Sequence, residues 1–228
     1  MQTIVDARIR APYGMVLSGP PQSGKTIFTI QLLDNLDRLV DQPFQRIYWF
    51  YGNHNRAINL LETAYKDTVT TVRGLPDDFT PYISTDGSHT LHIFDDLLRE
   101  ASSSKQLVDL TSRQSSHNFV SWILILQDLF YKGPERVTLL RNCHYIVQFR
   151  NPLNNTIPYL LAHRILPQDR KTFMEIFHRA TSKPNGYVFV DGAQQSSELL
   201  RLRTDIFGDY QIAYVPASVQ KTVGIKLL

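Results

Sequence analysis

The sequence predicts an α/β fold with a mostly parallel sheet and helices on both faces. Short apolar runs that suit buried strands alternate with segments whose apolar residues recur at helical spacing. Polar residues directly follow several of the apolar runs, as expected where parallel strands end at a ligand-binding edge. The 228 residues fit one domain, with a core over about 14–152 and a C-terminal helical and strand extension over about 153–228.

The first apolar run, Met15–Ser18, leads into a phosphate-binding pattern. The pattern G-x-x-x-x-G-K-[ST] is matched by Gly19-Pro20-Pro21-Gln22-Ser23-Gly24-Lys25-Thr26. Apolar residues at helical spacing follow over Ile27–Leu33. Because a strand precedes the pattern and a helix follows it, we interpret it as the phosphate-binding loop of a nucleoside triphosphatase. The alternative is a chance match in a Gly/Pro turn.

Each residue that the pattern specifies has a chemical task. Gly19 and Gly24 let the backbone turn so that its N–H groups form an anion site at a helix N-terminus. The Lys25 ammonium can reach the β- and γ-phosphates of ATP as a mobile charge. The Thr26 hydroxyl suits a Mg²⁺ ion, which prefers oxygen ligands and phosphates.

Two carboxylates end the apolar run Thr90–Phe94. We expect Asp95 to bind Mg²⁺, directly or through water, and Asp96 to orient and polarise the attacking water. The alternative is an Asp-Asp turn that caps a helix. The phosphate-binding pattern upstream favours catalysis, although many similar sites use the longer Glu as the second acid.

Gln127 follows the most apolar run of the chain, Phe119–Leu126. We interpret Gln127 as a sensor that bonds the γ-phosphate or the attacking water; the alternative is a strand-end amide in solvent. Arg113 is a candidate for an arginine that reaches a neighbouring subunit's γ-phosphate, and its alternative is a solvated surface charge. The competing arginines are Arg136, Arg141 and Arg150.

The remaining chain continues the alternation of strands and helices. The first helix is expected to end near Val40, before the break at Asp41-Gln42-Pro43. The last strands are expected to form a C-terminal β-hairpin at the sheet edge. Further strands are expected over Arg46–Tyr51, Thr68–Val72, Cys143–Phe149, Gly186–Asp191 and Leu200–Thr204. Further helices are expected over Arg56–Lys66 and Asp78–Ile83, within Ser102–Gln114, near Glu135–Arg141, and as a pair in 158–181 broken at Pro167.

The composition excludes several classes of protein. With 43% hydrophobic and 20% charged residues, the chain is ordinary for a globular protein, and no apolar run approaches the ~20 residues of a membrane span. We expect no secretory signal and no membrane partner. The single Cys143 rules out an internal disulfide framework, and the scattered histidines do not suit a structural zinc site. A net charge of +3 is compatible with nucleic-acid binding without arguing for it.

These stretches together resemble the packaging ATPases of the FtsK–HerA superfamily, in particular those of Polinton (Maverick) elements, adintoviruses and related double-stranded DNA viruses. The resemblance implies an additional-strand P-loop fold, with a strand between the phosphate-loop strand and the Asp-Asp strand. One departure is Asp128, where the family usually has Asn. The supporting stretches are Gly19–Thr26, Tyr51-Gly52, Gly74-Leu75-Pro76, Ile93–Asp96, Leu126–Phe130, Tyr145–Pro152 and Leu202–Phe207.

The resemblance also implies a function. It implies a homo-oligomeric ring that hydrolyses Mg-bound ATP and moves double-stranded DNA into a capsid, with a capsid portal or vertex as a further partner. It implies a location in the host cytoplasm or nucleus, or in association with the virion. Tyr131-Lys132-Gly133 is a candidate DNA-facing loop, with an ordinary turn as the alternative. The other functions that remain open are a DNA helicase of the same superfamily, a nucleotide kinase and a binding module that does not hydrolyse ATP.

Overall fold

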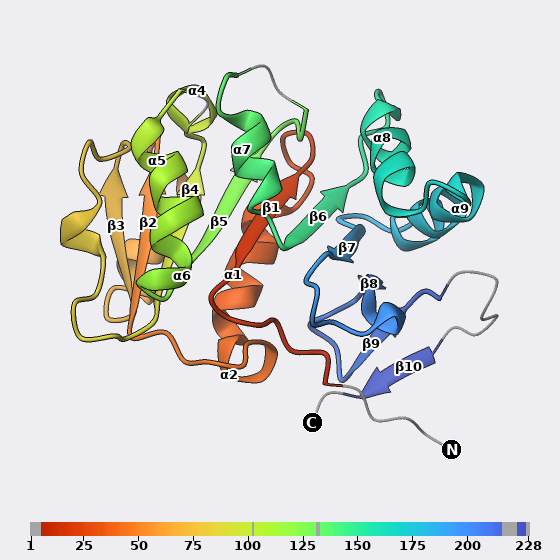
Figure 1. The fold of residues 1–228 in the computed structure, drawn as a ribbon, viewed down its shortest axis with the longest axis horizontal. Coiled ribbons are helices and arrows are strands. Elements are labelled where there is room, and N and C mark those ends of the chain that lie inside the picture. The colour runs from red at the N-terminus through yellow and green to blue at the C-terminus, as the bar shows by residue number, and fades with distance from the viewer. Residues whose placement is uncertain (1–5, 102, 131–132, 216–222, 227–228) are drawn as a thin grey trace.

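The computed structural model describes residues 6–101, 103–130, 133–215 and 223–226 (Figure 1). In this part of the chain, the strands form one ten-stranded sheet. The strands are β1 (Gly14–Ser18), β2 (Arg46–Tyr51), β3 (Val69–Arg73), β4 (Thr90–Asp95), β5 (Val120–Leu126), β6 (Tyr145–Phe149), β7 (Tyr187–Asp191), β8 (Leu202–Thr204), β9 (Tyr210–Ala213) and β10 (Val223–Lys226).

The strand order is β10-β9-β8-β7-β6-β1-β5-β4-β2-β3. From β6 to β3 every neighbouring pair is parallel, and from β6 to β10 every neighbouring pair is antiparallel. The additional strand implied by the family resemblance is therefore β5, which lies between β1 and β4. The predicted C-terminal hairpin is confirmed as the antiparallel pair β7 and β8. It does not form the edge itself, because β9 and β10 continue the sheet beyond it.

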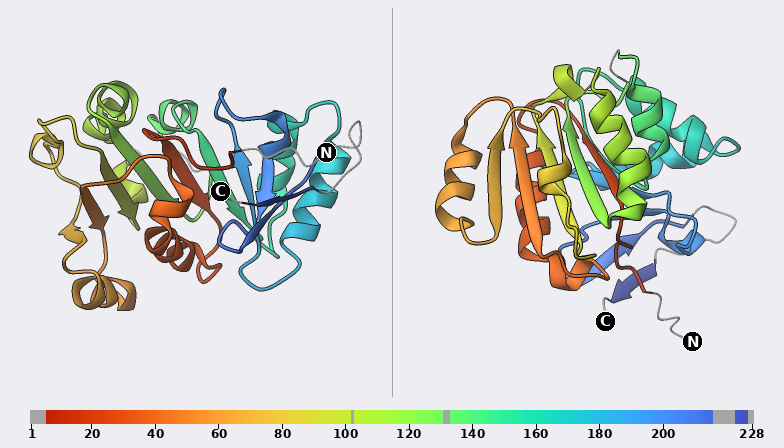
Figure 2. Two further views of the ribbon diagram at one scale, coloured as in Figure 1. Left: turned by 90° about the horizontal axis from the view of Figure 1, so that it is seen from below. Right: turned by 60° about the vertical axis from the view of Figure 1, so that its left-hand side comes forward.

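Helices cover both faces of the sheet, as Figure 2 shows from two further sides. On one face lie α1 (Lys25–Asp34), α2 (Leu36–Leu39) and α3 (Arg56–Ala64). The helical segments on the other face are α4 (Leu98–Ala101), α5 (Lys105–Asp109), the π-helical turn Leu110–Gln114, α6 (Ser115–His117), α7 (Arg136–Arg141), α8 (Thr156–Ile165) and α9 (Arg170–Ala180). Two 3₁₀ turns cover Thr80–Tyr82 and Glu198–Leu200.

The strands alternate their side chains between two cores. On β1, Leu17 packs with α1, whereas Val16 packs with the helices of the opposite face. On β5, Ile123 and Leu124 divide in the same way. Because side chains on a strand point alternately to the two faces, a strand that is covered on both sides must be apolar throughout. All seven residues of β5 are buried, which explains why this run is the most apolar in the sequence.

A buried ion pair joins the antiparallel strands to the N-terminal segment. The Arg203 guanidinium lies 2.9 Å from the Asp191 carboxylate, and both side chains are 1% exposed. Arg203 also donates to the Ala7 carbonyl at 2.6 Å, and its guanidinium lies 4.6 Å from the centre of the Phe189 ring. The chain before β1 is thereby held against the C-terminal strands.

Two of the predicted helices differ in the structure, and the one expected over Asp78–Ile83 is only the 3₁₀ turn Thr80–Tyr82. The helix expected to reach Val40 ends at Asp34, and α2 follows after Asn35. The Asn35 side chain donates to the carbonyl of Gln31 at 2.8 Å, and this kind of competition with the backbone makes Asn a poor residue inside helices. Val40 instead forms a parallel β-bridge with Ile9. Among the described helices, none has both the length and the apolar character needed to span a bilayer.

Candidate nucleotide-binding site

The phosphate-binding loop, Gln127 and the Asp pair leave three adjacent strands at the same edge of the sheet, the upper edge in Figure 1. In the parallel pairing, Ser18 is level with Leu126, and Ile125 is level with Asp95. Gln127 directly follows β5, so it lies between the phosphate-binding loop and the Asp pair along this edge. The predicted convergence of these side chains on one rim is what the strand register produces.

The backbone of the phosphate-binding loop adopts a conformation that requires glycine at both glycine positions of the motif. Gly24 is the residue before α1 and has φ +102°, a conformation that L side chains rarely adopt. A Cβ atom at Gly19 would lie 2.7 Å from the Cβ of Phe149, so this position also requires glycine. The first turn of a helix leaves backbone N–H groups without partners, and here they begin at Gly24. This arrangement attracts anions to the start of α1.

Lys25 lies within the loop. Its ammonium donates to the carbonyls of Gly19 at 2.6 Å and Pro20 at 2.7 Å. Burial lowers the pKa of Lys25, and the Asp95 carboxylate opposes this shift. The Ser23 hydroxyl is buried and has no hydrogen-bond partner among the described residues. A half-buried cation and an unpaired hydroxyl inside a loop of N–H groups suit the oxygens of a phosphate.

The two carboxylates differ in environment. Asp95 is 7% exposed, and burial raises its pKa to about 6. The Asp96 charge adds to this effect, while the Lys25 ammonium opposes it. Asp96 is exposed and has a left-handed backbone, with φ +56°. Its carboxylate accepts a hydrogen bond of 3.0 Å from the side-chain amide of Asn53.

The donors at this rim fit a Mg²⁺ ion that arrives with a nucleotide. The predicted ligands, Thr26 and Asp95, supply a hydroxyl and a carboxylate, and both are oxygen donors of the kind that Mg²⁺ prefers. Within the described ranges, no group of three or more His, Cys, Asp or Glu side chains could hold a metal by itself. Phosphate oxygens would have to complete the coordination, as is usual for Mg²⁺ bound with a nucleotide.

The arginine candidates lie in different places. Arg113, in the π-helical turn, is 84% exposed and lies 3.7 Å from Asp109. Two residues later, the Ser115 hydroxyl bonds the carbonyl of Val120, the first residue of β5. Arg113 therefore lies towards the opposite edge of the sheet and is not brought to the phosphate-binding loop of its own chain. Arg150 is exposed at the end of β6, the strand next to β1, and does lie at this rim.

The loop between α9 and β7 also reaches the site, and sequence reasoning missed it. A Cβ atom at Gly24 would lie 2.9 Å from the Cβ of Asn185 in this loop. Nearby, the Lys183 ammonium pairs with Asp205 at 2.6 Å. The pairing of β6 with β7 places this loop beside the phosphate-binding loop. No local pattern in 182–186 indicates this contact, because it depends on which strands are neighbours.

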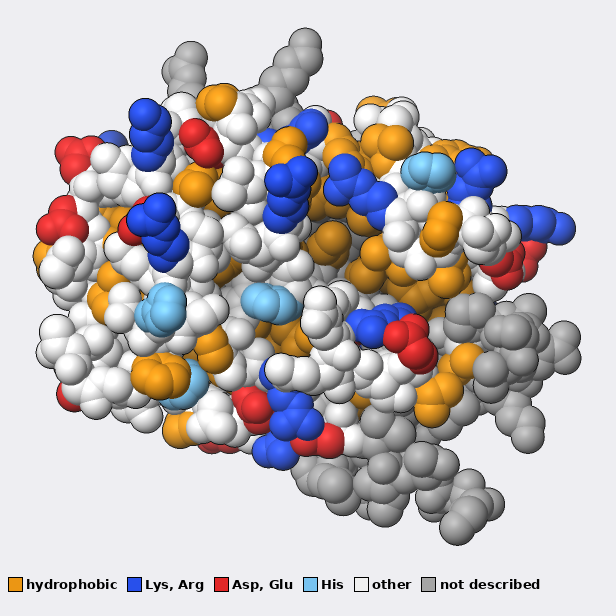
Figure 3. Space-filling view, in the orientation of Figure 1, with side chains coloured by type: hydrophobic (Ala, Val, Ile, Leu, Met, Phe, Trp, Pro, Cys, Tyr) orange, Lys and Arg blue, Asp and Glu red, His pale blue; other side chains and the backbone are white. Residues whose placement is uncertain are grey.

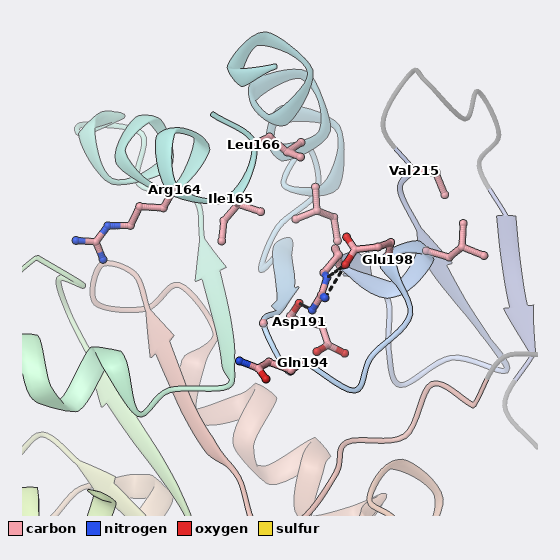
Figure 4. Close-up of a pocket in the computed structure, with 11 residues that line it drawn as sticks. Arg164, Ile165, Leu166, Asp191, Gln194, Glu198 and Val215 are labelled. Atoms are coloured by element: carbon pink, nitrogen blue, oxygen red, sulfur yellow. Dashed lines mark hydrogen bonds and ion pairs between the residues drawn. The ribbon is translucent and has the colours of Figure 1, made fainter. Parts of the chain in front are cut away.

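A separate cavity of about 430 Å³ lies near α8 and the end of β7 (Figure 4). Asp191, which lines it, is level with the first residue of β6, so the cavity lies towards the opposite edge of the sheet. Three of its charged side chains pair with protein groups: Arg201 lies 2.7 Å from Glu198, and Asp191 accepts a hydrogen bond from Arg203. The cavity is not part of the phosphate-binding rim.

Comparison with solved structures finds the same fold in viral packaging enzymes. The genome packaging NTPase B204 from Sulfolobus turreted icosahedral virus 2, in complex with AMPPCP, is 15% identical with a TM-score of 0.54, covering 81% of this chain and 95% of that chain. Its complex with ATP-gammaS is 15% identical with a TM-score of 0.52, covering 81% and 94%. B204, the DNA-packaging ATPase from Sulfolobus turreted icosahedral virus, is 11% identical with a TM-score of 0.50, covering 80% and 94%.

No family model and no curated protein matches the sequence. At this level of identity, the structural similarity shows the fold. It confirms the α/β P-loop fold predicted from the sequence. The neighbours themselves are described as genome packaging NTPases and, for B204 of Sulfolobus turreted icosahedral virus, as a DNA-packaging ATPase.

Proposed function

We propose that the protein is an ATP-hydrolysing motor that moves double-stranded DNA, acting as an oligomeric ring in the packaging of a viral genome. The observation that supports it best is the single rim that holds Lys25, Gln127 and the Asp95-Asp96 pair on three adjacent strands. A triphosphate bound at the loop would lie at the same rim as the carboxylates, because β1, β5 and β4 are adjacent and end level with one another.

Each side chain at the rim has a role in hydrolysis. Lys25 and the N–H groups at the start of α1 bind the phosphates and stabilise the charge that develops during transfer. Thr26 and Asp95 would hold Mg²⁺, which supplies charge neutralisation to the β- and γ-phosphates when bound. Asp96 accepts a proton from the attacking water, and the Gln127 amide orients that water or the γ-phosphate.

The neighbours support ATP as the substrate and packaging as the process. The genome packaging NTPases that share this fold have been solved with AMPPCP and ATP-gammaS, and they cover four-fifths of this chain. By analogy of fold, this chain acts on ATP in the same process. Activity in the infected cell, in the cytoplasm or nucleus or at the virion, belongs to the same proposal.

The surface supports DNA as the partner. Figure 3 shows Lys and Arg side chains spread over the upper part of one face, including the region of α7 and α8. Arg136 and Arg141 belong to α7, and Arg164 belongs to α8. Basic side chains beside a nucleotide site can neutralise DNA phosphates in a sequence-independent way. Of the candidate DNA-facing loop Tyr131-Lys132-Gly133, Tyr131 and Lys132 lie outside the described residues.

A ring would add an arginine from a neighbouring subunit. Arg113 remains the candidate from the sequence, because its exposed position leaves it accessible to a second subunit. Arg150, at the rim, is better placed to contact the phosphates in its own chain. In either position, an arginine would stabilise the charge on the transferred γ-phosphate.

The test is the rate of ATP hydrolysis with and without double-stranded DNA, for the parent protein and Lys25→Ala. We expect DNA to increase the parent rate, and Lys25→Ala to reduce it by at least about 100-fold, as for other groups that stabilise transition-state charge. Lys171→Ala is a matched control, because the Lys171 side chain is 90% exposed on α9, and it should keep the parent rate. A parent rate that is indifferent to DNA would contradict the motor.

Phosphate transfer to a nucleoside would instead indicate a nucleotide kinase, and separation of DNA strands would indicate a helicase. Binding of ATP without hydrolysis would indicate a binding module.

A further inference from the structure

An ion pair closes the loop between α9 and β7 beside the start of α1. The Lys183 ammonium donates to Asp205 Oδ1 at 2.6 Å, across 22 residues of sequence. In the same loop, Asn185 lies against Gly24 of the phosphate-binding loop, where an added Cβ would be 3.0 Å from Asn185 Oδ1. The ion pair and the contact with the phosphate-binding loop therefore belong to one short segment.

Asp205 belongs to a segment that is fixed to β7. The Thr204 hydroxyl donates to the Tyr187 carbonyl at 2.8 Å, and the Ile206 N–H donates to the Tyr187 hydroxyl at 3.0 Å. The Tyr187 ring lies edge-on against Phe28 of α1, with 4.9 Å between the ring centres. These residues on both sides of Asp205 are buried. The Asp205 carboxylate can therefore serve as an anchor for the α9–β7 loop.

The α9–β7 loop is exposed over residues 182–185, although its end is closely packed. The Gly186 N–H donates to the Lys183 carbonyl at 3.0 Å, and a Cβ atom at Gly186 would lie 2.7 Å from a carbonyl oxygen of α9. Asn185 has φ +58°, a costly conformation that persists where the surroundings determine it. The ion pair with Asp205 ties this exposed part of the loop to the sheet.

Gly24 gains from such support, because a glycine with φ +102° can reach many other backbone conformations. We propose that the Lys183–Asp205 pair is a clasp that holds the α9–β7 loop against the phosphate-binding loop, and so keeps that loop in the conformation that binds the phosphates of ATP. Lys183, Asp205 and Asn185 act in this role as positioning residues. The proposal rests on the proposed function.

The strand order shows which part of the reaction the clasp affects. The strands β7 and β8 lie beyond β6, on the side of β1 opposite to β5 and β4. The clasp is therefore separated by the phosphate-binding loop from Gln127 and the Asp pair, to which the proposed function assigns the γ-phosphate and the attacking water. Loss of the clasp should weaken nucleotide binding and leave the chemical step unchanged. ADP and ATP should lose affinity by the same factor, since both carry phosphates that the loop binds.

Two variants break the clasp, one at each end. Lys183→Met removes the charge and keeps most of the side-chain length, and Asp205→Asn keeps the size of the carboxylate. Because an exposed ion pair contributes little, we expect each to raise KM for Mg-bound ATP and the dissociation constant of ADP by about 2- to 5-fold, with kcat within about 1.5-fold. The double variant should show no larger change than either alone, because both break the same pair. Lys183→Arg keeps the cation and should have an affinity close to that of the parent.

Two further variants make the test specific. Asn185→Gly removes the side chain that lies against Gly24 and is compatible with φ +58°, so it should weaken the binding of both nucleotides in the same way. Lys171→Met breaks an exposed pair with Glu175 on α9 and should keep the parent KM. The side chains of the clasp are 57% and 33% exposed, so its variants are expected to fold, and thermal unfolding checks this.

Asp205→Asn also separates a clasp from direct contact between Lys183 and the nucleotide. If Lys183 bound the phosphates itself, loss of its partner would free the ammonium, and the affinity for ATP would stay the same or rise. That result would overturn the clasp, whereas a weaker affinity supports it.

The outcomes distinguish this inference from the proposed function. If the parent hydrolyses ATP in a Lys25-dependent way but the clasp variants keep the parent affinity or change only kcat, the clasp is overturned and the proposed function stands. If the parent binds ATP without hydrolysing it, the proposed function fails, and the affinities of the variants for ADP still decide for or against the clasp. If the parent does not bind ATP, both fail.

Discussion

Asn185 lies against Gly24, so that the loop between α9 and β7 contacts the phosphate-binding loop. Both residues have a positive φ, +58° for Asn185 and +102° for Gly24. The contact joins the C-terminal extension to the centre of the proposed site. The shape of the phosphate-binding loop therefore depends on strands that come more than 150 residues later in the sequence.

Gly24→Ala should weaken ATP binding by more than about 10-fold, because the new Cβ would strain the left-handed backbone and collide with Asn185. Titration with a fluorescent ATP analogue measures the affinity. Gly74→Ala is the matched control, since Gly74 also has a positive φ but has no atom within 4 Å of an added Cβ. That variant should lose a similar amount of stability and keep its affinity. Unchanged affinity in Gly24→Ala would disprove the close fit.

Much of the fold could be predicted from the sequence because its signals are local. The parallel strands β1, β4, β5 and β6 are short, mostly apolar runs, and the polar residues after them mark the binding edge. The strands β9 and β10 were not predicted. Each of these strands has four residues, and strands this short give little periodicity to recognise. The break at Asn35 depends on one side-chain hydrogen bond within a pattern that otherwise continues.

The site could be predicted only in part, for a similar reason. The phosphate-binding loop and the Asp pair are contiguous in sequence, so their chemistry is visible locally. The contact of Asn53 with Asp96 and the contact of Asn185 with Gly24 join residues far apart in the chain. They follow from the order of strands in the sheet, which no single stretch specifies. The position of Arg150 at the rim depends in the same way on the pairing of β6 with β1.

Asp95→Asn should stabilise the protein while it abolishes hydrolysis. Burial raises the pKa of Asp95 to about 6, so the folded state binds more protons than the unfolded state between about pH 4 and 6. Stability contributed by this group is therefore lost as the pH rises through that window, and at pH 7 the charge costs on the order of 1–3 kcal/mol. Urea unfolding at pH 7 should show a gain of that order. Asp77→Asn, at an exposed carboxylate, should show no gain.

His92 should make the protein less stable in mild acid. Burial lowers its pKa to about 4, against the hydrogen bond of its ring to the Tyr82 carbonyl. Its contribution to stability is complete above pH 6.5 and is lost as the pH falls from 6.5 towards 4, because the folded state excludes the proton. His92→Phe should therefore flatten the fall in unfolding midpoint between pH 7 and pH 4.5.

The contribution of Asp95 to stability has the opposite pH dependence over part of this range. The test therefore compares the pH slope of the unfolding midpoint between the parent and His92→Phe. The same substitution at the exposed His117 is the control and should leave the parent slope unchanged. An equal slope in the parent and His92→Phe would show that His92 does not titrate with unfolding.

Loss of one partner from the buried pair of Arg203 and Asp191 should lower the free energy of unfolding far more than loss of one partner from a surface pair. Arg203→Met leaves the Asp191 carboxylate buried without its partner and should cost about 3–5 kcal/mol of unfolding free energy. The double variant Arg203→Met/Asp191→Leu should recover part of this loss. Lys171→Met, in an exposed pair with Glu175, should cost less than about 1 kcal/mol. Similar losses at the two sites, measured by chemical denaturation, would contradict the importance of burial.

The most direct measurement compares binding and hydrolysis of Mg-bound ATP by the parent protein and Asp96→Asn. We expect the variant to bind ATP with an affinity close to that of the parent and to hydrolyse it at least about 100-fold more slowly, because the amide cannot accept the proton of the attacking water. A variant that hydrolyses ATP as fast as the parent would contradict the assignment of this rim as the catalytic site.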